Sequence, residues 1–145
     1  MISNNPEKVT HLSKNLDHLY DMGISAANAV QIGILKGYKT IILLGCDADY
    51  IEHIPEAHWF NEKTKTLIMK KNPVNNPNYW FKEYQLSGDK FNLPQVAKFH
   101  IPAWKNIFKL CPSEVKIING SLQSKIPFFD KKDNWVNELR LEQNI

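Results

Sequence analysis

A predicted helix followed directly by a short apolar strand, within Met22 to Tyr50, constrains the fold of this chain most. Ala26 to Lys36 keeps its polar residues on one narrow stripe, which predicts a helix packed on most of its sides. Gly37 follows at the position where glycine commonly ends a helix. Thr40 to Leu44 is rich in β-branched residues and lacks polar alternation, as in a strand covered on both faces of a parallel sheet. The stretch therefore predicts an α/β fold.

The same unit predicts where a ligand binds. A helix of about a dozen residues spans roughly 18 Å and a strand of six or seven about 20 Å, so the helix start and the strand end share one edge of the sheet. That edge carries Ser25, interpreted as the helix N-cap, and Asp47, which follows the strand. Free amides at a helix N-terminus bind phosphate, and open α/β sheets bind ligands at this edge. The alternative is that Ser25 only caps the helix and Asp47 only makes a turn.

The rest of the chain predicts further short elements. Val115 to Ile118 reads as a second buried strand, parallel to the first and followed by Asn119. His58 to Met69 fits either a small hairpin or an excursion over the site, and Lys71 to Asn78 is predicted to be a loop. Apolar spacing predicts a helix within Leu93 to Cys111, and Pro102 either kinks this helix or starts a second one. Apolar spacing predicts two more helices, in residues 6–22 and 134–141.

Composition narrows the class of protein. We expect one small three-layer, Rossmann-like domain with a short parallel sheet over residues 1–145, with residues 1–5 as a mobile tail. The 18 basic residues are scattered along the chain, which argues against nucleic-acid binding. The spacing of the Cys and His residues does not match a metal site, so we expect no metal or cofactor. Two free cysteines and no long apolar run predict a cytoplasmic protein without a membrane span. Unpaired sheet edges and an aromatic segment, Tyr79 to Tyr84, predict a homo-oligomer.

The residues from Ile24 to Asp47 resemble the nucleotide-binding half of the bacterial lipooligosaccharide sialyltransferases and of related motility-associated and surface-glycan proteins with a Rossmann-like fold. Ser25-Ala26 at the helix start and GYKTIILLGCD, which closes at Asp47, carry the resemblance. It continues more weakly through Val115 to Phe128. The resemblance implies a CMP-linked nucleotide sugar as ligand, with phosphate on the amides of Ser25, Ala26 and Ala27, and ribose or sugar hydroxyls on Asp47 or Asn119.

The chain departs from this family at several positions. Ala26 stands where the transferases have glycine, which leaves less room for close backbone approach. The family's phosphate-contacting tyrosine is matched by Asp49, with Tyr50 one residue later, and both become candidate nucleotide contacts. The histidine base of the family is matched by Asn78, and asparagine takes up no proton at neutral pH. The donor-contributing N-terminal half of such an enzyme is not matched.

Two function hypotheses follow. The first is a sialyltransferase-like domain in surface-glycan assembly that binds a nucleotide sugar. As an active enzyme it would use direct displacement at the anomeric carbon, with a base that activates the acceptor hydroxyl. The candidate catalytic residues are then Asp47 and His58. His58, like His53, belongs to the loop region after the first strand. The alternative is a catalytically inactive binding or interaction protein that keeps the fold.

Overall fold

The computed structural model describes residues 9–79 and 81–142, so the predicted tail of residues 1–5 and Trp80 of the aromatic segment lie outside the described residues. The described part forms two compact units. One contains the chain up to Asp49 and again from Val96 onwards, and the other is Tyr50–Gln95. We describe each unit by itself.

The first unit is built on a parallel sheet. Its three strands, in the order β1-β5-β6, are β1 (Thr40–Leu43), β5 (Lys116–Asn119) and the short β6 (Asp130–Lys131). β1 and β5 pair in parallel, as do β5 and β6. The prediction that these two strands pair in parallel is therefore confirmed, but only β5 is central, because β1 lies at the edge of the sheet. No sequence pattern predicts β6, which has only two residues and no apolar run.

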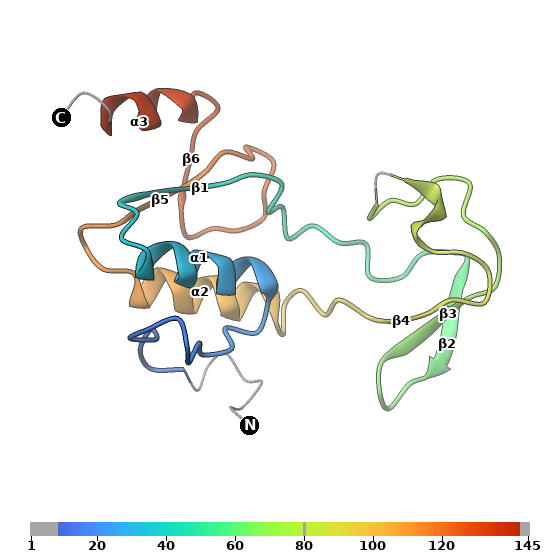
Figure 1. Cartoon of the computed structure of the whole chain (residues 1–145). Helices are drawn as coiled ribbons and strands as arrows, with labels where there is room; N and C mark the ends of the chain where they lie inside the picture. The colour runs from blue at the N-terminus through green and yellow to red at the C-terminus, as the bar shows by residue number, and fades with distance from the viewer. Residues whose placement is uncertain (1–8, 80, 143–145) are drawn as a thin grey trace. The chain divides into compact units, whose positions relative to one another are not determined.

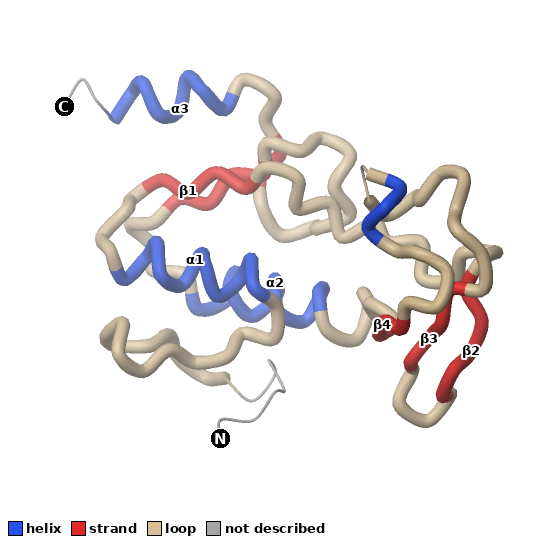
Figure 2. Tube along the Cα trace, turned by 45° about the vertical axis from the view of Figure 1, so that its right-hand side comes forward, coloured by secondary structure: helices blue, strands red, loops and turns tan. Residues whose placement is uncertain are grey.

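Three helices surround this sheet: α1 (Ser25–Leu35), α2 (His100–Leu110) and α3 (Trp135–Glu142). α1 and α2 pack against each other on one side of the sheet, while α3 contacts β1 and lies on the opposite side (Figures 1 and 2). Pro102 stands in the first turn of α2, so it lies at the start of a helix and does not kink one. The helix predicted from Leu93 onwards is wrong for residues 93–99, which contain no helix. No helix among the described residues is long and apolar enough to cross a membrane.

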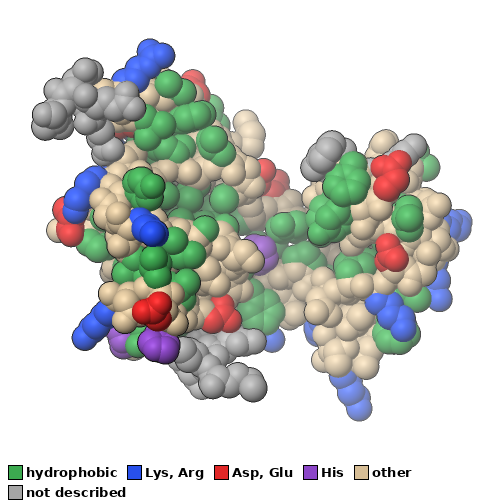
Figure 3. All heavy atoms as spheres, in the orientation of Figure 1, with side chains coloured by type: hydrophobic (Ala, Val, Ile, Leu, Met, Phe, Trp, Pro, Cys, Tyr) green, Lys and Arg blue, Asp and Glu red, His purple; other side chains and the backbone are tan. Residues whose placement is uncertain are grey.

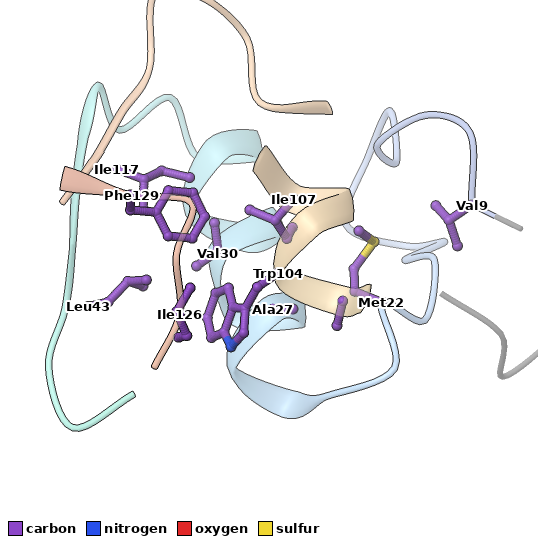
Figure 4. Close-up of a cluster of buried hydrophobic side chains, with 11 residues drawn as sticks. Val9, Met22, Ala27, Val30, Leu43, Trp104, Ile107, Ile117, Ile126 and Phe129 are labelled. Atoms are coloured by element: carbon purple, nitrogen blue, oxygen red, sulfur yellow. The ribbon is translucent and has the colours of Figure 1, made fainter. Parts of the chain in front are cut away.

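The core of the first unit lies between α1, α2 and the sheet. Figure 4 shows Trp104 of α2 beside Ala27 of α1 and Ile126, which lies in the chain between β5 and β6. Trp104 is 2 % exposed, and both Ala27 and Ile126 are fully buried. At about 25 cal/mol per Å² of buried apolar surface, a tryptophan in this position is a main source of stability for the unit.

The sheet is less covered than predicted. β1 is half-buried along Thr40, Ile41 and Ile42, and only Leu43 is buried, so the expectation of a strand covered on both faces is wrong for most of β1. Leu44 directly after the strand is 54 % exposed. Apolar side chains also gather at the surface around α3, as the space-filling view shows (Figure 3). A parallel sheet with an exposed margin is unusual, because parallel strands are normally buried on both faces.

The second unit contains an antiparallel sheet in the order β2-β3-β4: β2 (Ala57–Asn61), β3 (Thr66–Met69) and β4 (Lys90–Asn92). β2 and β3 form the hairpin that was one of the two alternatives for His58 to Met69. The register shifts between Trp59 and Asn61, so an extra residue stands in the edge strand β2. The remaining regular element is the short 3₁₀ helix η2 (Lys82–Tyr84), and the loop predicted at residues 71–78 has no regular secondary structure.

The helix predicted in residues 6–22 is wrong for its described part, because residues 9–22 contain no helix. Polar side chains hold this segment instead. Gln31 of α1 is fully buried, accepts a hydrogen bond from Ser13 N at 2.8 Å and donates one to Tyr20 O at 2.9 Å. Ser13 Oγ accepts another from Tyr20 N. Side chains that bond the backbone in this way compete with helical hydrogen bonds.

Candidate functional site

The first turn of α1 presents free backbone donors. The N-cap residue is Ile24, in an extended conformation, and no side chain caps the helix. The N-cap role predicted for Ser25 is therefore wrong, since Ser25 is itself the first helical residue and is exposed. Asn28 N bonds Ile24 O at 3.1 Å. Within the described residues, the amides of Ser25, Ala26 and Ala27 have no hydrogen-bond partner.

Polar side chains just outside this turn explain where the helix begins. Asn28 Oδ1 accepts a hydrogen bond from Met22 N at 2.7 Å, and Asp21 Oδ1 accepts one from Gly23 N at 2.8 Å. Both satisfy amides that precede the helix and so fix the chain that enters it. The three amides of the first turn stay available, and they stand at the positive end of the helix dipole.

The first turn of α1 and the end of β1 belong to the same edge of the unit. In Figure 1, α1 runs back beneath β1, so its N-terminus lies toward the end of the sheet where β1 finishes. Ala27 belongs to the hydrophobic core, and Ala26, Cys46 and Ala48 pack against that core. The start of α1 and the end of β1 thus lie toward the same end of the sheet, as the helix and strand lengths predict.

The loop after β1 is held by the chain that follows β5. Gly45 N donates a hydrogen bond to Ser121 Oγ at 2.9 Å, Ser124 Oγ donates one to Cys46 O at 2.8 Å, and Lys125 N donates one to Asp47 O at 2.7 Å. These bonds fix the backbone, whereas the side chains of Asp47 and Asp49 are exposed. Their carboxylates are therefore available to hydroxyl groups of a ligand.

Asn119, the last residue of β5, carries an unsatisfied buried donor. The residue is fully buried, and its Oδ1 accepts a hydrogen bond from Ser121 N at 3.0 Å. Its Nδ2 is the buried side-chain polar atom for which the described residues provide no partner. Alternation along β5 places Asn119 on the same face as Ile117, which belongs to the core against α1 and α2. Such an atom is costly unless water or a ligand satisfies it.

Cys46, which directly precedes Asp47, has a thiol whose pKa is raised by its surroundings. Burial raises its pKa above the ordinary value, and the neighbouring Asp47 carboxylate raises the pKa further. Because the thiolate is the nucleophilic form, a raised pKa makes Cys46 less reactive at pH 7. We therefore assign Cys46 a packing role.

The predicted site residues divide between the two units. Ser25, Ala26, Ala27, Asp47, Asp49 and Asn119 all belong to the first unit, whereas Tyr50 and His58 belong to the second. His58 is exposed on β2, where it pairs with Ile68 of β3. No group of three or more His, Cys, Asp or Glu side chains in the described part of the chain is arranged to hold a metal ion.

Asn78, which matches the family's histidine base, has a structural role in the second unit. Its Oδ1 accepts a hydrogen bond from Ile51 N and its Nδ2 donates one to Ile51 O. Its backbone N donates to Asn76 Oδ1 at 3.0 Å. Sequence reasoning missed this role because the partner lies 27 residues away along the chain.

Comparisons of the chain with known protein families, curated proteins and solved structures find no match. The geometry of the site is therefore the basis for a functional proposal. That geometry is a set of unpaired donors, from α1 and from Asn119, at the edge where β1 and β5 end. Donors in this arrangement suit a ligand rich in acceptor atoms, of which phosphate is the strongest example.

Proposed function

We propose that this chain is a Rossmann-like, sialyltransferase-like domain that binds a nucleotide sugar in surface-glycan assembly. The observation that carries the proposal is the set of unpaired amides of Ser25, Ala26 and Ala27 at the sheet edge where β1 ends. A phosphate bound there gains hydrogen bonds and about 0.3 to 1 kcal/mol from the helix dipole. The resemblance of Ile24 to Asp47 to the transferases supports a CMP-linked donor in particular.

The remaining site residues of the first unit each have a role in this proposal. The Nδ2 of Asn119 is a donor and therefore binds an acceptor atom of the ligand, either a phosphate or a hydroxyl oxygen. Asp47 and Asp49 are acceptors and bind ribose or sugar hydroxyls. Tyr50, the other nucleotide contact expected from the sequence, belongs to the second unit and has no role in this proposal.

An active transferase also needs a base for the acceptor hydroxyl, and His58, the candidate from the sequence, belongs to the second unit and not to the unit that carries the proposed phosphate site. The second function, binding without catalysis, is favoured by one specific observation. Both ends of the Asn78 side-chain amide are used by the backbone of Ile51, so this position supports structure in place of acid–base chemistry. Both functions use the same binding site. They differ in whether the bond between the sugar and the nucleotide is cleaved.

The deciding experiment measures thermal stability with CMP, UDP and GDP, with cytidine as a ligand that lacks phosphate. A ligand at a hundredfold excess over its Kd stabilises by about 2.7 kcal/mol, which raises Tm by roughly 5 to 10 °C for a chain of this size. We expect CMP to raise Tm and cytidine to have little effect. The proposal fails if no nucleotide changes Tm. Release of CMP from a CMP-sugar then separates the transferase from the silent binding protein.

A further inference from the structure

A cavity lies in the first unit, between the C-terminal end of α2 and the segment that leads into β6. Its volume is about 270 Å³, which corresponds to about nine water molecules in the liquid. Three phenylalanines form part of its wall, together with Val115 and Ile117. None of these residues belongs to the nucleotide site proposed above.

The aromatic wall presents ring faces and edges. The Phe108 and Phe128 rings are stacked with centroids 6.0 Å apart and planes inclined by 28°, and the Phe129 ring meets Phe108 at 6.1 Å and 66°. Phe108 is 54 % exposed although it lines the cavity. A large apolar side chain left this open at a concave surface is suited to contact with a small apolar ligand.

The polar groups of the cavity give it a negative character. Asp130 lines it, and in the described part of the structure its carboxylate accepts no hydrogen bond and forms no ion pair. Lys132 interacts electrostatically with Asp130, but its ammonium group forms its ion pair with Glu138. The cavity also lies at the C-terminal, negative end of the α2 dipole.

The pKa of Cys111 is consistent with the negative character of the cavity. Burial raises the pKa of the Cys111 thiol above its ordinary value, and the nearby Glu114 carboxylate raises the pKa further. The protonated thiol donates a weak hydrogen bond to Val115 O at 3.5 Å. Lys109, Lys116 and Lys131 are sequence neighbours of lining residues, but none of the three lines the cavity.

We propose that this cavity is a binding site for a small organic cation with an apolar body, such as an arylalkylamine. The ammonium group pairs with Asp130 and the negative end of α2, and the apolar body packs on Phe108 and Phe128. Aromatic faces attract cations, and a carboxylate that lacks a partner provides the counter-charge. Anionic ligands are repelled, and neutral ligands leave Asp130 unpaired.

The test uses three small probes of nearly the same shape: benzylamine, benzyl alcohol and benzoate, which are a cation, a neutral molecule and an anion at pH 7. Each is titrated into isotope-labelled full-length protein, and amide shifts are followed by NMR. We expect benzylamine to shift the amides of Phe108, Cys111 and Asp130, and to bind at least about fivefold more tightly than benzyl alcohol. Benzoate binds more weakly than either.

Variants separate charge recognition from simple occupancy of a cavity. Asp130→Asn removes the carboxylate at an exposed position and should abolish the preference for benzylamine, while the matched exposed control Asp133→Asn keeps it. Alkylation of Cys111, mapped by mass spectrometry, should slow with benzylamine, and Cys46 provides an internal control that does not change. The proposal is overturned if the three probes bind equally, if the shifts map elsewhere, or if Asp130→Asn retains the preference.

Discussion

The side-chain amide of Asn78 bonds both backbone polar groups of Ile51, with Oδ1 accepting from Ile51 N and Nδ2 donating to Ile51 O, each at 2.8 Å. This pairing resembles one rung of a β-ladder made by a side chain. It needs a donor and an acceptor on the same planar group, which asparagine has and a histidine ring does not present side by side. Asparagine is thus the residue type that fits the local structure at position 78.

Replacing Asn78 by alanine should therefore loosen the loop after Tyr50. We expect a loss of roughly 1 kcal/mol, because both bonds are exposed to water. Hydrogen exchange of the Ile51 amide measures the change directly and should become faster. Asn75→Ala is the control, since Asn75 is an exposed neighbour. Equal Ile51 exchange in the native chain and in Asn78→Ala would show that the pairing does not form in solution.

Gly120 allows α3 to dock on the end of the sheet. A Cβ atom at this position would lie 2.5 Å from Leu44 Cδ2 and 2.9 Å from Trp135 Cδ1. The exposed Leu44 side chain is able to rotate away, but the Trp135 ring has less freedom. We expect Gly120→Ala to destabilise the first unit by about 1 to 3 kcal/mol in denaturant unfolding. In a Trp135→Ala background the same substitution should cost less, and an unchanged cost would exclude this contact as the cause.

Glu138 of α3 bonds both Lys116 and Lys132, and this arrangement makes the docking of α3 sensitive to pH. The two ammonium groups lower the pKa of Glu138 below its ordinary value of 4.5, Lys116 first and Lys132 next. A carboxyl whose pKa is lower in the folded state stabilises that state above the unfolded pKa and loses the contribution as pH falls through the folded pKa.

We therefore expect α3 amides to exchange faster as the pH is lowered from 6 through 4.5 and below, after correction for intrinsic exchange rates. Glu138→Gln should exchange faster already at pH 6 and show little further change. Glu114→Gln is the control, because its distant pair with Lys39, at 4.0 Å, lies between exposed side chains. A native-like pH profile in Glu138→Gln would contradict the assignment.

The elements that sequence predicted well are those in which local pattern and tertiary burial agree. α1, the pairing of β1 with β5 and the β2–β3 hairpin are coded by apolar runs bounded by turn residues such as Gly37, whose φ of 84° is one that glycine adopts without strain. The N-terminal segment has helical spacing but no helix. Its conformation depends on hydrogen bonds from Tyr20 N to Ser13 Oγ and from Ser13 N to Gln31 Oε1, which no local sequence pattern reveals.

The candidate site follows the same division. It was predictable from element lengths that the start of α1 and the end of β1 lie toward the same end of the sheet, because a tight turn joins a helix and a strand of similar length. The position of the first helical residue was not, since Asn28 and Asp21 take the amides of Met22 and Gly23. The unpaired Nδ2 of Asn119 could not be predicted from the sequence either, because it depends on the hydrogen bonds that the neighbouring groups form in the folded structure.

A homo-oligomer stays a prediction, and the structure suggests where to test it. β1 is an edge strand of the parallel sheet, and Leu44 at its end is 54 % exposed. Pairing of a second copy along this edge would cover both. Leu44→Lys should then reduce the mass measured by light scattering to that of a monomer, while Leu122→Lys, at a loop position 50 % exposed, should not. A monomeric mass for the native chain would contradict the prediction.

The phosphate site is tested most directly at Ser25, which is exposed at the first position of α1. Ser25→Glu places a carboxylate beside the three unpaired amides, where the helix dipole stabilises it by about 0.3 to 1 kcal/mol. The fold is therefore retained while the site for a phosphate is filled and made negative. We expect calorimetry to show at least about a tenfold loss of CMP affinity.

Ala29→Glu is the matched control for this change, because it adds the same charge to an exposed position of the same helix beyond the first turn. It should bind CMP nearly as the native chain does. Ala27 is unsuitable for the test, since it is fully buried and a glutamate there would disrupt the core. If Ser25→Glu binds CMP as tightly as Ala29→Glu, the amides of the first turn do not hold the phosphate, and α1 has only a structural role.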